Sequence, residues 1–280
     1  MQKPKKKTAP SKAGRPERKA DRQSKPESGK SSEIGPGERI NRYLATCGLC
    51  SRREADRWIA EGRIALNGKT VEQPGVKIGR GDIVAVDGRV VTPALENTYI
   101  LYNKPRGLLC SRKDAKGRPL IYEHLDIAAN VQSVGRLDMD SEGLLILTDN
   151  GALAQKLTHP GAKIPRQYRV RITGQLSLES LESLRRGGID IGDGELSDPW
   201  EITVDSGARG HSWFTVTIHR GRWREIRRTV QACGHEVRRL LRTRFGPLKL
   251  DPEMPPGAWR NLTAGELRQL KKAAAFGQKG

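Results

Sequence analysis

The stretch VGRLDMDSEGLLILTDNG, residues 134–151, concentrates side chains that could do chemistry in this 280-residue chain. Between two apolar runs it places one arginine and three acids, namely Arg136, Asp138, Asp140 and Glu142. The pattern predicts a strand ending at Leu137, a charged turn over 138–143 and a second strand over 144–147. Turns that leave a sheet often carry function, so this turn is the first candidate site.

Calcium binding is one chemistry that this spacing could support. Acids and a glycine occupy positions one, three, five, six and twelve of an EF-hand loop, here Asp138, Asp140, Glu142, Gly143 and Asp149. An EF-hand, however, lies between two long helices and ends in a bidentate glutamate. Here the preceding segment is a predicted strand and the last acid is an aspartate, which disfavours calcium.

Two other interpretations of the same turn stay open on the residues alone. A carboxylate pair could act at the anomeric carbon of a sugar, where a buried acid stabilises developing positive charge. The plainer interpretation is a surface turn in which Asp138 caps the backbone and Arg136 offsets its charge. Sequence does not fix the distance between carboxylates, so it does not decide between these two.

The charge balance points to a polyanionic partner. Lys and Arg total 51 against 32 acids, giving a formal net charge of +19 and a pI near 10.1. A surplus of this kind in a soluble protein is typical of nucleic-acid binding. Residues 1–36 carry +7 of it and contain one large aliphatic residue, Ile34. They predict a disordered basic arm, which either grips RNA or DNA weakly or only keeps the protein soluble.

Cysteine usage and hydropathy predict a reduced, cytoplasmic protein without a membrane span. Four cysteines do not make a disulfide framework in a chain of this length, and no run approaches 18 apolar residues. Cys47 and Cys50 form a CxxC pair that lacks the second pair needed for a zinc site. We therefore expect neither a metal nor another cofactor.

Residues 38–91 predict a small helix-pair and sheet module. An apolar face begins at Ile40, Ser51 and Glu54 form a predicted capping box, and Asn67-Gly68 and Asp87-Gly88 predict hairpin turns. The segment RINRYLATCGLCSRREADRWIAEGRIALNGKTV resembles the S4 RNA-binding domain. The resemblance implies RNA contacts from Arg39, Ser51, Arg52, Arg53 and Arg57.

The rest of the chain predicts a larger α+β domain. Strands are expected over 99–102, 108–111, 167–173, 201–204 and 213–218, and helices over 176–186 and 262–275. A further helix is expected to open in the basic segment 219–228 and to run through Val230 to Cys233. The first of these helices has a leucine stripe expected to face the core: Leu176, Leu178, Leu181 and Leu184. Arginines cluster near the end of the chain, in GRWREIRRTV and EVRRLLRTRFG.

Residues 98–272 resemble the catalytic domain of the RsuA/RluB family of pseudouridine synthases. YNKPRGLLCS, VGRLDMDSEGLLILTDNG, RQYRVRITG, GRWREIRRTV and EVRRLLRTRFG occur in the order found in that family. The resemblance, strongest to the RluB-like enzymes of the large ribosomal subunit, implies an S4 domain over 37–94 and a synthase domain over 98–272. The synthase domain is then a mixed, mostly antiparallel sheet with helices, and residues 273–280 form a short tail.

The resemblance also implies roles for individual residues. Asp138 corresponds to the catalytic aspartate, Arg136 to the arginine that fills the place vacated by the target nucleotide, and Tyr168 to the tyrosine stacked on the uracil. Arg227 or Arg228 is expected to pair with Asp138, and Leu240 to line the base pocket. Asp140 and Glu142 are then left with shaping the turn.

Remaining expectations concern the RNA. Backbone contacts are expected from four basic residues, Lys104, Arg106, Arg222 and Arg224. Trp213 and Trp223 are expected in the core or at its rim. The implied activity is isomerisation of a uridine of ribosomal RNA, in 23S rRNA by the closer resemblance, by a monomer without cofactor. The alternative is a catalytically silent RNA-binding factor for ribosome assembly.

Overall fold

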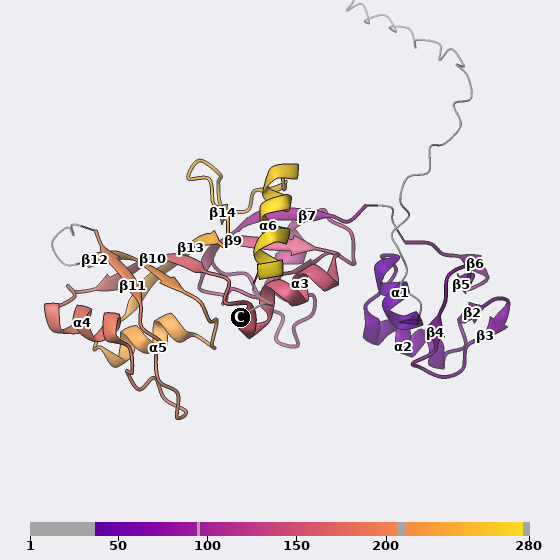
Figure 1. The fold of residues 1–280 in the computed structure, drawn as a ribbon, viewed down its shortest axis with the longest axis horizontal. Helices are drawn as coiled ribbons and strands as arrows, with labels where there is room; N and C mark the ends of the chain where they lie inside the picture. The colour runs from indigo at the N-terminus through magenta and orange to yellow at the C-terminus, as the bar shows by residue number, and fades with distance from the viewer. Residues whose placement is uncertain (1–36, 94–95, 206–210, 277–280) are drawn as a thin grey trace, which may run out of the picture. The chain divides into compact units, whose positions relative to one another are not determined.

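The computed structural model describes residues 37–93, 96–205 and 211–276 (Figure 1). The predicted basic arm over 1–36 lies outside these residues, as do the last four residues of the chain. In the described part, no helix is long and apolar enough to cross a membrane.

The first module contains two helices and short antiparallel strands. Its elements are β1 Glu38–Arg39, α1 Ile40–Thr46, α2 Arg52–Ala60, β2 Ile64–Leu66, β3 Lys69–Thr70, β4 Lys77–Ile78, β5 Val84–Val86 and β6 Arg89–Val90. The Ser51 hydroxyl caps α2 by accepting from the Glu54 amide at 3.2 Å, as predicted. Asn67 and Asp87 have positive φ angles and are each followed by a positive-φ glycine, which confirms the two hairpin turns.

The second module is a nine-stranded sheet with helices. Its elements are β7 Tyr99–Lys104, η1 Ile121–His124, β8 Gln132–Ser133, β9 Glu142–Thr148, α3 Gly151–Thr158, η2 Pro160–Ala162, β10 Arg166–Thr173, α4 Leu178–Arg186, β11 Glu201–Val204, β12 His211–Ile218, α5 Glu225–Ala232, β13 Val237–Phe245, β14 Leu248–Lys249, β15 Trp259–Asn261 and α6 Ala264–Phe276. The strand order is β11-β12-β10-β13-β9-β7-β15, with β14 on β13 and β8 on β9. Strands β9 and β13 run parallel, and the neighbouring ladders are antiparallel. The predicted mixed, mostly antiparallel α+β fold is confirmed.

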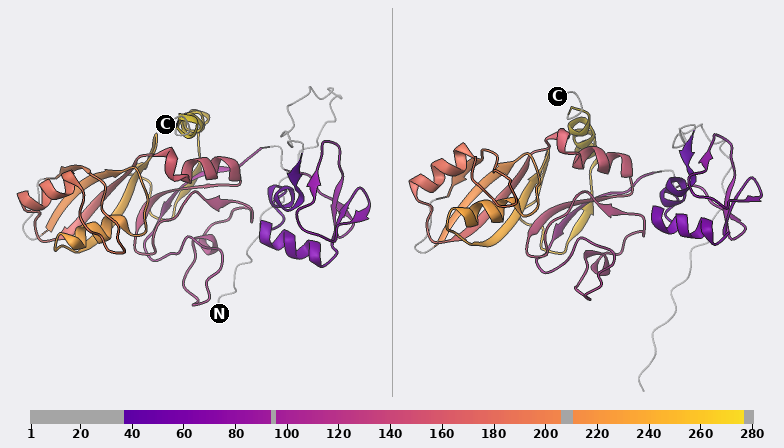
Figure 2. Two further views of the ribbon diagram at one scale, coloured as in Figure 1. Left: turned by 60° about the horizontal axis from the view of Figure 1, so that its bottom comes forward. Right: turned by 90° about the horizontal axis from the view of Figure 1, so that it is seen from below.

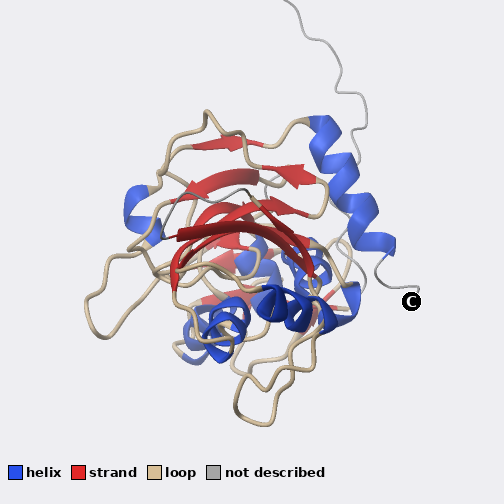
Figure 3. Cartoon of the chain, turned by 90° about the vertical axis from the view of Figure 1, so that its left-hand side faces the viewer, coloured by secondary structure: helices blue, strands red, loops and turns tan. Residues whose placement is uncertain are grey.

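Helices cover different faces of this sheet along its length. Leu144 and Ile146 of β9 pack in one cluster with Leu153 and Leu157 of α3 and with α6, while the alternate β9 residues, including Leu145, face the larger cluster that contains α5. Figures 1 and 2 show α3 and α6 near β7 and β9, with α4 and α5 at the β10–β12 end, and Figure 3 shows helices on more than one side of the strands. Strands β7 and β9 are therefore buried on both faces, whereas β10 and β13 keep exposed residues.

Several predicted boundaries were wrong, for identifiable reasons. The strand before the charged turn ends at Ser133, because Gly135 takes a left-handed φ of 71° and turns the chain. Residues 108–111 do not return along β7, whose two edges are taken by β9 and β15. Leu178 is 81 % exposed at the start of α4, so it does not belong to the core stripe. Helix α6 spans Ala264–Phe276, within two residues of the predicted range at each end, and Ala274 is buried.

Candidate active site

A cavity of about 190 Å³ opens beside the loop between β8 and β9. Asp138 and Arg136 line it from the loop, Tyr168 from β10 and Leu240 from β13. These four residues lie as far as 104 positions apart in the sequence. The sheet thus brings together four of the six residues that were predicted for the catalytic site.

A buried lysine holds the backbone of the Asp138 loop. The ammonium group of Lys104, at the end of β7, is fully buried and donates to the carbonyl oxygens of Asp138 at 3.1 Å and Ser141 at 2.8 Å. Burial lowers the pKa of Lys104, and nearby carboxylates oppose that effect. The prediction that Lys104 contacts RNA phosphates is therefore wrong, because its ammonium group is buried and lies within hydrogen-bond distance of four backbone carbonyl oxygens.

Close packing of β9 against β13 fixes the other end of the loop. Gly143 lies opposite Arg242 in the parallel ladder and has a φ of 103°. A β-carbon at this position would overlap the Arg242 carbonyl oxygen and come within 2.9 Å of its amide nitrogen. Only glycine fits, so Gly143 sets the distance between the Asp138 loop and the β13 side of the cavity.

Arg224 is the basic residue that faces Asp138. Its guanidinium lies 3.7 Å from a carboxylate oxygen of Asp138 and 3.3 Å from one of Asp140. Arg224 precedes α5 in the left-handed region, with a φ of 48°, an uncommon conformation for a non-glycine residue that often occurs at functional sites. Arg224 also lines the cavity with a partly exposed side chain, and its predicted contact with the RNA backbone stays a prediction.

The two arginines expected to pair with Asp138 have other partners. Arg227 donates to the Asp140 carbonyl at 2.9 Å and lies 3.3 Å from the Asp140 carboxylate. Arg228 binds Glu195 at 2.7 Å and the carbonyl of Ile191 at 2.7 Å, away from the loop. The expected Arg227 or Arg228 pair with Asp138 is therefore wrong, since the turn of α5 directs these side chains to Asp140 and to the 191–195 loop.

The three acids of the loop have different environments. Asp140 is bonded by two arginines, and Glu142 makes a two-bond pair with Arg239. No hydrogen bond from the described residues reaches the carboxylate of Asp138. Arginines therefore hold two of the three acids that the calcium interpretation would need as ligands, and the geometry gives that interpretation no support. Asp138 is the acid that remains available to a substrate.

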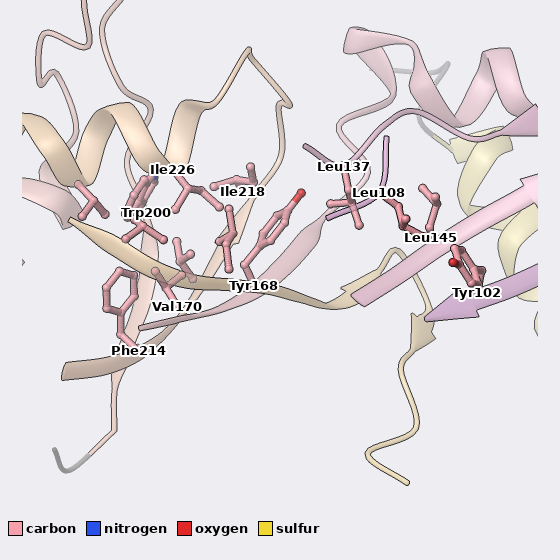
Figure 4. Close-up of a cluster of buried hydrophobic side chains, with 14 of the residues drawn as sticks. Tyr102, Leu108, Leu137, Leu145, Tyr168, Val170, Trp200, Phe214, Ile218 and Ile226 are labelled. Carbon is pink, nitrogen blue, oxygen red and sulfur yellow. The ribbon is translucent and has the colours of Figure 1, made fainter. Parts of the chain in front are cut away.

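Tyr168 and Leu240 form the apolar wall of the cavity. Both are buried, at 7 % and 5 % exposure, in the cluster that includes Ile218 and Ile226. Figure 4 shows Tyr168 beside Ile218, with its hydroxyl pointing away from Val170. A flat apolar surface ending in a polar atom suits the face of a nucleobase.

Arg242 is a cavity residue that the sequence did not single out. It lies directly opposite Tyr168 across the β10–β13 ladder and donates to the Leu144 carbonyl at 2.7 Å. The side chain is 2 % exposed, and one of its terminal nitrogens has no partner among the described residues. This pairing depends on the register of strands 74 residues apart, for which the local sequence carries no signal.

Positive charge dominates the cavity lining. Five arginines and two acids contribute to it: Arg136, Arg166, Arg222, Arg224 and Arg242, with Asp138 and Glu225. Burial raises the pKa of Glu225, which weakens its negative charge, whereas a hydrogen bond from the Arg222 amide acts in the opposite direction. A lining of this sign favours an anionic ligand.

The predicted RNA-contact residues divide into engaged and exposed groups. Arg222 donates to the Leu196 carbonyl and to Asp198, so it mainly ties the 196–198 segment to α5. Arg106 is exposed next to the Asp138 loop. The five candidates of the first module are exposed as well: Arg39, Ser51, Arg52, Arg53 and Arg57. Their RNA contacts stay a prediction.

The two tryptophans differ in position. Trp213 lies half-buried under the Arg169 guanidinium, 4.8 Å from its ring centroid. Trp223 is 66 % exposed between Arg222 and Arg224, with Arg228 above its ring at 5.6 Å. Trp223 is thus a rim residue.

Comparison with known proteins places both modules. The family model described as RNA pseudouridylate synthase matches residues 98–232, and the S4 domain model matches residues 38–84. An RNA pseudouridine synthase of Aquifex aeolicus without an assigned role is 40 % identical over 241 residues, covering 85 % of this chain and 95 % of the relative.

Relatives with an assigned role are similar over almost the same span. The ribosomal large subunit pseudouridine synthase B of Escherichia coli is 35 % identical, covering 84 % of this chain and 82 % of the relative. The Pseudomonas aeruginosa protein of the same name is 36 % identical, covering 84 % of this chain and 62 % of the relative. A crystal structure of a pseudouridylate synthase superposes with a TM-score of 0.59 at 27 % identity, covering 83 % of this chain and 99 % of that one.

Proposed function

This chain belongs to the RNA pseudouridylate synthase family, and from that membership we propose that it isomerises a specific uridine of ribosomal RNA through the carboxylate of Asp138. The reaction breaks the bond between N1 and C1′, turns the uracil and joins C5 to C1′. Nothing is oxidised and no group is lost, so the proposed chemistry requires no cofactor. The relatives named as large-subunit synthases support the large ribosomal subunit as the source of the RNA.

One observation carries the assignment of Asp138. Among the three acids of the loop, only the carboxylate of Asp138 accepts no hydrogen bond from the described residues. Lys104 binds the backbone carbonyl of Asp138, and the Arg224 guanidinium lies 3.7 Å from its carboxylate. A nucleophile or base acting on the ribose needs an acceptor oxygen that the protein has oriented without occupying it. Asp140 and Glu142 fail this requirement because arginines hold them.

The proposed substrate pose follows from the cavity walls. The scissile bond is inaccessible in a stacked helix, so the target nucleotide must leave the stack and enter the cavity. There the uracil would lie against Tyr168 and Leu240, with the sugar toward Asp138. Arg136 is exposed at the mouth of the cavity and would occupy the place that the nucleotide leaves.

RNA binding outside the cavity is proposed for the exposed basic residues. In the first module these are Arg39, Arg52, Arg53 and Arg57, with Ser51 at the helix N-terminus. Arg106 adds a charge beside the Asp138 loop. Such contacts hold the RNA backbone and leave selection of the uridine to the cavity and its surroundings. The division into modules at 37–94 and 98–272, the monomeric state and the cytoplasmic location remain predictions.

The decisive experiment is to map pseudouridine in ribosomal RNA from a strain that lacks the gene and from the same strain complemented with variants. Wild-type protein should restore at least one pseudouridine, and Asp138→Asn should restore none while binding RNA within a few-fold of wild type. Asp126→Asn, at an exposed aspartate, is the matched control and should restore modification. Turnover by Asp138→Asn would refute the role of that residue, and an unchanged map in the deletion strain would refute the proposed substrate.

A further inference from the structure

A second cavity adjoins the candidate active site. It has a volume of about 540 Å³, and three residues line both cavities: Gly135, Arg136 and Thr158. Arg136 therefore borders the Asp138 cavity and the second cavity at the same time. When an RNA places its target nucleotide at Asp138, the adjacent nucleotide of that RNA can therefore reach the second cavity.

The second cavity is suited to a nucleotide by charge. Arg112 and Arg136 are the charged residues among those that line it, and no acid is included. A phosphate at Arg136 would also meet the positive charge of the other arginines that line the two cavities. The volume also falls within the range of cavities that bind small molecules.

A fixed planar surface forms one side of this cavity. The Arg112 guanidinium lies 4.0 Å from the centroid of the Tyr122 ring. Arg112 also donates to the carbonyl oxygens of Val131 and Ala128, and the Tyr122 hydroxyl accepts from the Ser133 amide at 2.9 Å. Arginine planes and aromatic rings are the usual stacking partners of unpaired RNA bases. Here both are held in position before a ligand arrives.

Two amide side chains in the lining of the second cavity could bind the edge of a base. Gln132 extends from β8 and Gln155 from α3, both exposed and both lining the cavity. Each amide carries donors and an acceptor, the combination that recognises base edges. The side chains of Gln132 and Gln155 form no hydrogen bond with the described residues.

We propose that this second cavity binds the base of an unpaired nucleotide adjacent to the target uridine, and that Gln155 contributes to its recognition. The inference rests on the proposed function, since it takes a uridine at Asp138 as given. It assigns part of the enzyme's sequence selectivity to residues that have no contact with the reacting nucleotide.

The test pairs a protein variant with an altered RNA. Once the modified uridine is mapped, a stem-loop of ribosomal RNA carrying it is prepared intact and with an abasic residue at either neighbour. We expect one abasic substitution to lower kcat/KM of the wild type about tenfold, the value of one stacked base. Gln155→Ala should lower kcat/KM on intact RNA about fivefold, the value of one hydrogen bond. On that abasic RNA the Gln155→Ala loss should vanish.

Gln231→Ala is the matched control, because Gln231 is also an exposed glutamine on a helix, α5. Its kcat/KM should equal wild type on each RNA, and melting temperatures should show that both variants fold. An equal Gln155→Ala loss on intact and abasic RNA would overturn the inference, as would wild-type indifference to both abasic sites. The proposed function would instead be refuted at the mapping step, if wild-type protein restored no pseudouridine in ribosomal RNA of the deletion strain.

Discussion

The ammonium nitrogen of Lys104 lies 3.1 Å from the carbonyl oxygen of Asp138, and it is fully buried. The lysine thus acts on the backbone of the proposed catalytic residue and leaves its carboxylate untouched. Its other acceptors are the carbonyl oxygens of Met139 and Ser141, in the same loop as Asp138, and that of Pro105, the next residue in the chain. Lys104 is a positioning residue on this geometry.

Replacing Lys104 with methionine should therefore disable the loop. The carbonyl groups would lose their donor, which should reduce the free energy of unfolding by about 3 kcal/mol. Displacement of Asp138 by an ångström should lower kcat about 100-fold. Thermal unfolding and single-turnover pseudouridine formation measure the two effects. Lys113→Met, at an exposed lysine, is the control, and full activity of Lys104→Met would contradict the positioning role.

Asp140 should make stability dependent on pH in the acid range. Burial acts to raise its pKa, but Arg227 and Arg224 outweigh burial and hold the pKa below the ordinary value of 3.8. An acid with a lowered folded pKa stabilises the protein above its unfolded pKa, and the stabilisation is lost as the pH falls through the folded pKa.

At pH above ~5, the melting temperature of Asp140→Asn should thus be about 2–4 °C lower than that of the wild type. This value is already reduced for the partial exposure of the ion pairs. The difference should shrink as the pH is lowered from ~5 to ~3. Melting curves over this range test it, with Asp126→Asn as an exposed control. A difference that is constant with pH would show that Asp140 acts through packing instead of charge.

Tyr168 should serve the substrate through its ring. Tyr168→Phe keeps the apolar face and should retain kcat/KM within about fivefold, the value of one hydrogen bond. Tyr168→Ala removes the surface against which the uracil is proposed to lie and should cost about 100-fold, as loss of base stacking does at its upper limit. Steady-state kinetics on a mapped RNA measure both. Equal losses would assign the role to the hydroxyl.

Local sequence predicted the elements of the fold better than their ends. Capping by Ser51 and the two hairpin turns depend on neighbours in the chain, and the structure confirms them. The strand to Leu137 failed because Gly135 turns the chain, which periodicity does not reveal.

The sequence predicted which residues line the cavity better than it predicted which side chains contact one another there. Asp138, Tyr168 and Leu240 line one cavity, as the family resemblance implied. That resemblance named the wrong arginine, because which guanidinium reaches Asp138 depends on the left-handed turn at Arg224. The local sequence did not predict the burial of Lys104 either, since a basic turn reads the same whether its lysine faces water or backbone carbonyl groups.

The exposed arginines of α2 should dominate the salt dependence of RNA affinity. Arg52 and Arg53 are exposed in the first turn of the helix. Their double alanine variant should reduce the slope of log Kd against log salt by about 2, since each phosphate contact contributes slightly less than 1. A double variant at Lys69 and Arg89, two exposed basic residues on the strands of the same module, removes equal charge and should change the slope less. Equal changes would mean that the module attracts RNA by net charge alone, and an unchanged slope for the α2 variant would exclude this helix from RNA binding.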